Sequence, residues 1–217
     1  LGDFDIDSGI GGQVHRGYYN KVFGSWNVYG FLSLLSDYLY DTYSGFDGIV
    51  VTGHSQGGAF ATLFGIYEAR QHPERTVTVY SMGSPRIGND DFKQSVRSIP
   101  NLTIFRMVME DDAVARLPYR FLSYRHVGHL LHMKEDGETK AYFQQTGDSA
   151  LSYSGVPDSE WNIDWTAGDP ITDHLPESYL AALDLAMTNT SLWPTDFEAE
   201  EPPLTCCRRF IICLEWC

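Results

Sequence analysis

The fold of this chain is decided by residues 48–59, which read Gly48-Ile49-Val50-Val51-Thr52-Gly53-His54-Ser55-Gln56-Gly57-Gly58-Ala59. The β-branched run over residues 49–52 predicts a buried strand. Apolar residues then recur at helical spacing until Pro73, which predicts a helix directly after the serine. A strand, a G-x-S-x-G turn and a helix in this order are the context that a serine nucleophile requires.

The glycines around Ser55 have a physical purpose. A serine that attacks an ester carbonyl must project from a crowded turn, and Gly53 and Gly57 let neighbouring backbone pass without a Cβ clash. The following helix would direct its N–H groups and positive dipole end toward developing negative charge. An ordinary glycine-rich turn is the alternative, but the flanking strand and helix and the further glycine Gly58 favour a nucleophile.

Composition bounds the class of protein. The chain has 217 residues, which fits one α/β domain, and 43% of them are apolar, which is enough for a sizeable core. The net charge of -14 argues against nucleic acid or an anionic membrane surface as the main partner. No apolar run is long enough to span a bilayer. The first residue is Leu1, so we expect a processed product or a fragment.

The C-terminal region differs in composition from the rest. All four cysteines lie there, at Cys206, Cys207, Cys213 and Cys217. Two disulfides would form in an oxidising compartment, with three possible connectivities, whereas the adjacent pair disfavours a zinc site. The acidic, proline-ended residues 198–203 predict a linker. We therefore expect a catalytic domain over residues 1–197 and a separate tail over residues 198–217; the alternative is that apolar tail residues pack onto the domain.

The remaining pattern alternates between strands and helices, which predicts a mostly parallel sheet with right-handed crossovers. Ligands of such sheets bind at the carboxyl ends of the strands, where Ser55 lies. Two acceptor patterns for N-glycosylation, at Asn101 and Asn189, indicate secretion. The elements that we expect besides residues 48–72 are a long helix over residues 15–43, strands over 76–82 and 102–109, a short helix through Ile99, a hairpin of residues 129–133 and 140–144, and a final helix over 177–188.

A serine nucleophile needs a base, and the base needs an acid that fixes its tautomer. Hydrolases of this type supply these partners in the chain order serine, acid, histidine. Asp112 follows a strand end, and His174 lies in a loop before the last helix, so both are expected beside Ser55. Of the other histidines, His54 is expected to point away from the site. Three more are expected in surface or core positions, namely His126, His129 and His132.

Several motifs resemble those of the class 3 lipases, the fungal triacylglycerol lipase and feruloyl esterase family. Residues 53–59 resemble the family's nucleophile elbow, the sharp G-x-S-x-G turn that carries its serine, in which leucine usually stands in place of Gln56. Residues 14–18 are similar to its V-H-x-G-F helix start, and residues 82–89 to its F-G-x-P-R-V-G-N turn. Residues 106–118 resemble its acid segment, in a register that selects Asp112 over Asp111, with Ala115 in place of the usual proline. Residues 172–175 resemble its D-H segment.

The resemblance implies an α/β-hydrolase that hydrolyses carboxylic esters, most favourably as a secreted lipase acting on lipid esters at a lipid–water interface, without metal or cofactor. Ser55 would attack, His174 would serve as general base and then acid, and Asp112 would orient it. The backbone N–H of Gln56 would be an oxyanion donor. The alternatives are a catalytically weak or silent hydrolase-fold protein or fragment that binds apolar ligands and, less favoured by the motifs, a serine peptidase.

The N-terminal region departs from the family pattern. The family's upstream strands, oxyanion loop and lid precede the V-H-x-G-F motif, where this chain has thirteen residues. We therefore expect a chain that is N-terminally truncated relative to the family, with one oxyanion donor missing and one sheet edge open. Gly9, Gly11 and Gly12 are the candidates for a substitute amide. The cysteine tail has no counterpart in the family pattern.

Overall fold

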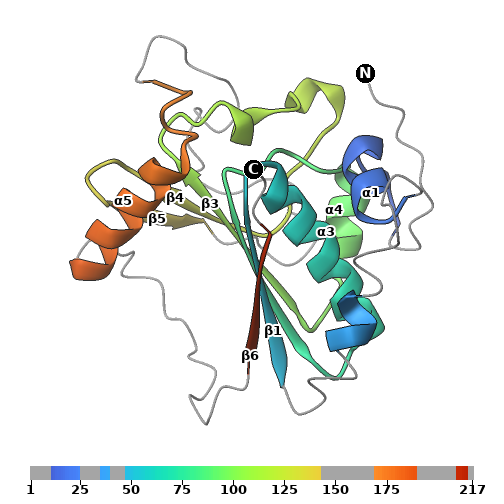
Figure 1. The fold of residues 1–217 in the computed structure, drawn as a ribbon. Coiled ribbons are helices and arrows are strands. Elements are labelled where there is room, and N and C mark those ends of the chain that lie inside the picture. The colour runs from blue at the N-terminus through green and yellow to red at the C-terminus, as the bar shows by residue number, and fades with distance from the viewer. Residues whose placement is uncertain (1–10, 25–34, 40–46, 143–168, 190–208, 215–217) are drawn as a thin grey trace.

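A six-stranded sheet forms the centre of the computed structural model, which describes residues 11–24, 35–39, 47–142, 169–189 and 209–214 (Figure 1). The strand order is β5-β4-β3-β2-β1-β6. All neighbouring strands run parallel except β4 and β5. The strands are β1 (Gly48–His54), β2 (Thr76–Met82), β3 (Leu102–Met109), β4 (His129–Met133), β5 (Thr139–Tyr142) and β6 (Arg209–Leu214).

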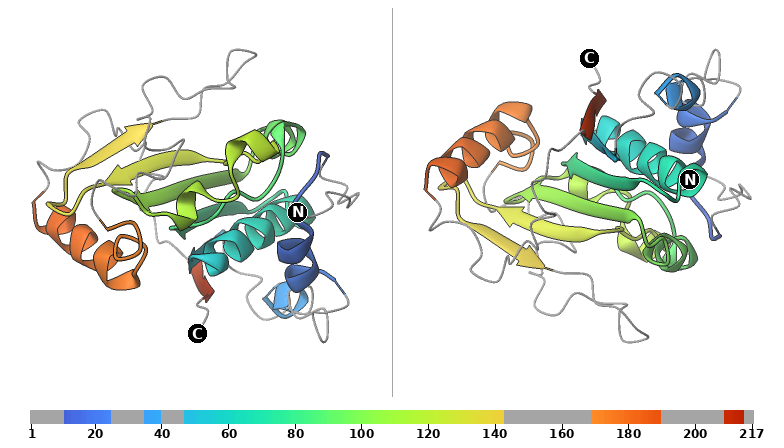
Figure 2. Two further views of the ribbon diagram at one scale, coloured as in Figure 1. Left: turned by 90° about the horizontal axis from the view of Figure 1, so that it is seen from above. Right: turned by 90° about the horizontal axis from the view of Figure 1, so that it is seen from below.

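Helices cover both faces of this sheet. Seen from above in Figure 2, α5 lies on one face and α1, α3 and α4 lie on the other. The helices are α1 (Arg16–Val22), α3 (Gln56–Gln71), α4 (Asp90–Arg97) and α5 (Pro176–Thr188), with 3-10 turns η1 (Val114–Arg116) and η2 (Arg120–Leu122). A mostly parallel sheet covered on both faces is the α/β-hydrolase architecture that the sequence predicts.

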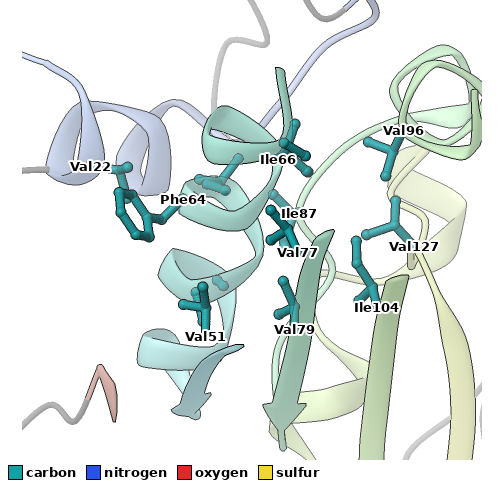
Figure 3. Packing of buried hydrophobic residues seen from close by; sticks show 14 of the residues in the cluster. Val22, Val51, Phe64, Ile66, Val77, Val79, Ile87, Val96, Ile104 and Val127 are labelled. Atoms are coloured by element: carbon teal, nitrogen blue, oxygen red, sulfur yellow. The ribbon is translucent and has the colours of Figure 1, made fainter. Parts of the chain in front are cut away.

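Alternate residues of the central strands pack against different helices. On β2, Val77 and Val79 are buried beneath α3, where Gly65 allows the close approach, since a Cβ on Gly65 would lie 2.3 Å from Val79 Cγ2 (Figure 3). On β3, Ile104 belongs to the same cluster, whereas Met107 and Met109 belong to a second cluster with residues of α5. Truncating a side chain buried in such a core costs roughly 2–5 kcal/mol.

Most predicted elements are confirmed. Strands β2 and β3, the hairpin of β4 and β5 and the final helix lie where the sequence predicts them. The long helix predicted over residues 15–43 is wrong at Gly24, because α1 ends at Val22 in a turn. A Cβ at Gly24 would come within 2.7 Å of Asn20 Cα, so this turn depends on glycine. Residues 35–39 are helical, and residues 25–34 and 40–43 lie outside the described residues.

The C-terminal tail differs from the expectation of a separate segment. Residues 209–214 form β6, which pairs in parallel with β1 from Gly48↔Arg209 to Gly53↔Leu214. We expected one edge of the sheet to be open, but in the structure the outer side of β1 is paired with β6. The physical reason is that Phe210, Ile211 and Ile212 have high strand propensity and β1 offers a row of unpaired backbone groups. Residues 198–208 and 215–217 lie outside the described residues, so the domain boundary at residue 197 and the disulfides stay predictions.

Two general properties of the described residues bear on partners. No helix among them has both the length and the hydropathy to cross a bilayer. Within the same ranges, no group of three or more His, Cys, Asp or Glu side chains could hold a metal ion.

Removal of β6 tests its part in the sheet. We expect truncation after Phe197 to lower the melting temperature by roughly 5 °C or more and to promote concentration-dependent association, because β1 becomes an edge. Differential scanning calorimetry and size-exclusion chromatography measure these effects. Ile211→Pro removes one backbone donor of β6 and should reproduce part of the loss, whereas Ile211→Val is the matched control. A truncated chain that stays monomeric and equally stable would contradict the role of β6.

One buried carboxyl within α3 has a direct effect on stability. Glu68 has 0% of its surface exposed, and among the described residues neither of its carboxylate oxygens has a hydrogen-bond partner. Burial raises the pKa of the Glu68 carboxyl, and the nearby positive charge of Arg75 opposes part of this rise. Because the folded-state pKa lies above the unfolded value, the contribution of Glu68 to stability is fully present below its unfolded pKa and is lost as the pH rises through its folded pKa.

Replacement of this carboxyl should therefore stabilise the protein at alkaline pH. We expect Glu68→Gln to raise the free energy of unfolding by about 1 kcal/mol at pH 8, because no charge is buried. The gain should vanish toward pH 4, where the carboxyl is protonated in both states. Urea denaturation at the two pH values measures it, and Glu74→Gln, at a 60% exposed glutamate, is the control. A gain that is equal at both pH values would show that ionisation of Glu68 is not the cause.

Candidate active site

Ser55 lies at the sharp turn between β1 and α3. Its backbone has φ 56° and ψ -126°, a region that non-glycine residues rarely adopt, and its N–H donates to the Met82 carbonyl at 2.8 Å. A Cβ on Gly53 would lie 2.3 Å from the Gly57 carbonyl oxygen, and one on Gly58 would lie 2.9 Å from Ser84 Cβ. The turn that projects Ser55 therefore requires glycine at both positions.

Asp112 follows the end of β3 and is completely buried. Its Oδ1 accepts hydrogen bonds from the N–H groups of Val114 at 2.8 Å and Ala115 at 3.3 Å. Its Oδ2 accepts one from the Tyr179 hydroxyl at 2.6 Å. A carboxylate removed from water is tolerated only when its oxygens are satisfied in this way, and these donors also fix its orientation.

His174 connects the other two side chains. Its Nδ1 lies 3.0 Å from both carboxylate oxygens of Asp112, and its Nε2 lies 2.8 Å from Ser55 Oγ. An Nδ1–H that donates to the carboxylate leaves Nε2 free to accept the serine proton. The three residues that the sequence selects are thus brought into one hydrogen-bonded chain from β1, β3 and the turn before α5.

The turn that carries His174 is bonded to the residues on either side of Asp112. The Asp173 carboxylate accepts a hydrogen bond from the Asp111 N–H at 3.1 Å, and the Ala113 N–H donates to the Pro170 carbonyl at 3.1 Å. Burial raises the pKa of the Asp173 carboxyl, and the hydrogen bond from Asp111 opposes this rise. The segments on either side of Asp112 and His174 are therefore joined by bonds besides the central one.

His54 also holds this turn, which corrects the expectation that it points away from the site. Its Nε2 lies 2.7 Å from the His174 carbonyl oxygen, and the centroids of the His54 and His174 rings are 4.8 Å apart. Burial and the neighbouring His174 lower the pKa of His54, which keeps it neutral at neutral pH. Its Nε2–H donates to that carbonyl. No sequence pattern indicates this contact, because it joins residues 120 positions apart.

Tyr179 is a second residue of the candidate site that the sequence does not reveal. It lies on α5, is 1% exposed, and its hydroxyl donates to Asp112 while accepting from the Met109 N–H at 3.0 Å. In the sequence it is indistinguishable from a core aromatic. The hydroxyl joins α5 to the end of β3 and holds the carboxylate that faces His174.

A buried arginine is hydrogen-bonded to the backbone of the segment that carries Asp112. Arg116 donates to the backbone carbonyl of Asp112 at 2.6 Å and to that of Glu110 at 2.8 Å, and it forms an ion pair with Asp111 at 3.1 Å. Asp111 therefore faces Arg116 and not His174, in the register expected from the sequence. The remaining histidines of this region contact the protein interior. His126 contacts the Ala115 carbonyl, His132 contacts the Glu110 carbonyl, and the ring of His129 on β4 lies beside that of Phe105.

Gln56 is the first residue of α3, so its N–H is one of the four at a helix start that have no intrahelical partner. Its side chain accepts a hydrogen bond from Lys21 Nζ on α1 at 3.2 Å. Of the candidates for a second amide, Gly11 and Gly12 lie against α4, where added Cβ atoms would meet Ser95 Oγ at 2.5 Å and Phe92 N at 2.0 Å. Gly9 lies outside the described residues.

The Tyr179 hydroxyl offers a structural test of the site. We expect Tyr179→Phe to lower the free energy of unfolding by about 1–3 kcal/mol, because the Met109 N–H and an Asp112 oxygen lose a partner in the interior. Urea denaturation measures the change. Tyr80→Phe is the matched control, because its ring stacks on Phe105 away from Asp112, and it should change stability by less than about 0.5 kcal/mol. Equal effects of the two substitutions would contradict the role of the hydroxyl.

Known structures share this fold. A Rhizomucor miehei lipase propeptide complex matches with a TM-score of 0.61 at 23% identity, over 81% of this chain and 52% of that one. The lipase from Rhizopus microsporus var. chinensis matches with a TM-score of 0.59 at 25% identity, over 81% of this chain and 57% of that one. Both likenesses cover most of this chain and little more than half of the other.

Curated relatives are named as lipid ester hydrolases. Triacylglycerol lipase OBL1 of Ricinus communis is 41% identical over 92 residues, 38% of this chain and 18% of that protein. Phospholipase A1-Igamma1 of Arabidopsis thaliana is 30% identical over 130 residues, which are 49% of this chain and 25% of that protein. Secreted mono- and diacylglycerol lipase 1 of Fusarium solani is 42% identical over 77 residues, which are 36% of this chain and 22% of that protein. The matched part spans a quarter or less of each of these relatives.

The family model described as Lipase (class 3) matches residues 2–122, which is more than half of the chain. This match includes the turn that carries Ser55 and the segment that carries Asp112, and the structural likeness extends the agreement to the fold as a whole. The chain therefore belongs to the class 3 lipase family.

Proposed function

We propose that this chain hydrolyses carboxylic esters of lipids, with Ser55 as nucleophile, His174 as general base and acid, and Asp112 as the residue that orients His174. The single observation that supports this best is the continuous hydrogen-bonded chain from Ser55 Oγ through the His174 ring to the buried Asp112 carboxylate. Family membership supports the same reaction class.

The reaction follows from this geometry. Ser55 Oγ bonds to the ester carbonyl carbon while His174 Nε2 takes its proton, and the carbonyl π electrons move onto oxygen. When the carbon–oxygen double bond re-forms, the bond to the alcohol oxygen breaks, and the alcohol leaves with the proton from Nε2. Water then repeats the sequence on the acyl-enzyme: His174 accepts its proton, the acid is released and Ser55 regains its hydrogen.

Two features would stabilise the charges that form. The Asp112 carboxylate is completely buried and faces the His174 ring through Nδ1, so it would attract the imidazolium more strongly than an exposed carboxylate would. The Gln56 N–H, at the positive end of the α3 dipole, would donate to the oxyanion that forms beside Ser55. A single oxyanion donor is typically worth on the order of 10²–10³ in kcat.

The substrate is inferred from the relatives and from the surface beside the site. The names triacylglycerol lipase, phospholipase A1 and mono- and diacylglycerol lipase share an acyl ester of glycerol. Ile171 and Leu175, on either side of His174, are 66% and 45% exposed, which is apolar surface for an acyl chain. We infer a glycerolipid acyl ester at a lipid–water interface, outside the cell, on a surface that is not strongly anionic given the net charge of -14.

Substitution of the three residues tests the reaction. We expect Ser55→Ala to lower kcat/KM on a short-chain diacylglycerol by roughly 10⁴-fold or more and Asp112→Asn to lower kcat by about 10⁴-fold, because the wrong histidine tautomer is then favoured. Titration of the released fatty acid measures both rates. Ser98→Ala, at the end of α4, is the control and should retain full activity. Retained turnover in Ser55→Ala would reject the nucleophile and favour a protein that only binds apolar ligands.

A further inference from the structure

Asn101 opens the first glycosylation acceptor sequence, and it lies in the turn immediately before β3. Its side-chain Nδ2 lies 2.9 Å from the carbonyl oxygen of Ala69, 3.2 Å from that of His72 and 2.8 Å from that of Arg75. Its own carbonyl accepts a hydrogen bond from the Val77 N–H at 2.8 Å. One asparagine thus joins the end of α3, the start of β2 and the start of β3.

The Ala69 carbonyl belongs to the last turn of α3, where carbonyls have no intrahelical donor. The His72 and Arg75 carbonyls lie in the connection between α3 and β2. The Asn101 amide therefore donates to three carbonyls that lie close together, one in the last turn of α3 and two in the connection to β2. This contact lies at the amino ends of the strands, opposite the carboxyl ends where Ser55 lies.

N-glycosylation uses the same nitrogen. The Nδ2 atom bonds to C1 of a sugar and loses one proton, while the bond from C1 to the pyrophosphate of a lipid-linked oligosaccharide donor breaks. The product keeps one N–H and carries a bulky polar group that must remain in water. In the folded chain the Asn101 Nδ2 faces three carbonyl oxygens, so a sugar at this nitrogen would take one of its two hydrogens and would have to occupy space that these carbonyls line.

The second acceptor asparagine has a different environment. Asn189 is exposed and caps the C-terminal end of α5, where its backbone N–H donates to the Leu185 carbonyl at 3.0 Å. Its neighbours Met187 and Thr188 are also exposed. A glycan on this exposed residue at the end of α5 would leave the Asn101 contacts between α3, β2 and β3 in place.

We propose that the two acceptor sequences have different roles in this protein: Asn189 is the site of N-linked glycosylation, and Asn101 stays unmodified. The hydrogen bonds of its side chain to the three carbonyls, here called the Asn101 clamp, join α3 to the sheet. This assignment is independent of the hydrolytic activity. A chain folded with a glycan at Asn101 would lack the clamp, so only material unmodified there reaches the native state.

The glycan assignment is tested on protein secreted from a eukaryotic host. Peptide mass spectrometry, before and after peptide N-glycosidase, should find the folded protein glycosylated at Asn189 and unmodified at Asn101. Thr103→Val removes the first acceptor sequence without changing Asn101 and should leave the glycan mass unchanged, whereas Ser191→Ala should remove the glycan. A glycan on Asn101 of folded protein, or folded protein bare at Asn189, overturns the assignment.

The clamp is tested on protein made in bacteria, where neither asparagine is glycosylated. Asn101→Asp places a carboxylate against three carbonyls and should lower the melting temperature by roughly 5 °C or more. Asn101→Gln displaces the amide by one methylene and should also be destabilising. Asn189→Asp and Thr103→Val are the controls and should melt within about 2 °C of the parent chain. An Asn101→Asp protein as stable as its parent would overturn the role of the clamp.

Discussion

The contact between the Asp112 carboxylate and His174 Nδ1 is the interaction on which the rest of the site depends. Asp112 is 0% exposed, and a carboxylate so deeply buried is stable only with donors on both oxygens. Two of those donors are backbone N–H groups of the following turn, one is the Tyr179 hydroxyl and one is His174. The requirement to satisfy this carboxylate therefore ties β3, α5 and the His174 turn together.

Other residues hold the segments that carry Asp112 and His174. Arg116 fixes the backbone of the acid segment, and the Asp173 carboxylate joins that segment to the His174 turn. His54 joins the His174 carbonyl to the end of β1, directly beside Ser55. Ser55, His174 and Asp112 are each held by their own element and also by contacts between the elements, as the catalytic roles that we propose for them require.

The sequence predicted the parts that have local signatures. The elbow, the strands β2 and β3 and the order serine, aspartate, histidine follow from spacing, glycine placement and the family resemblance. Tyr179 and His54 could not be predicted, because their contacts span 67 and 120 residues and their side chains resemble ordinary core residues. The sheet position of β6 was missed for a similar reason, since strand propensity does not say which edge a strand will pair with.

The central claim is that Ser55 alone is activated by this hydrogen-bonded chain, and covalent labelling tests it most directly. The protein is treated with a fluorophosphonate, which reacts with an activated serine and not with a merely exposed one, and the modified residue is located by peptide mass spectrometry. We predict a single adduct on Ser55, formed far more slowly in Asp112→Asn and absent in His174→Ala. An adduct on another residue, or equal labelling rates in these variants, would contradict the account.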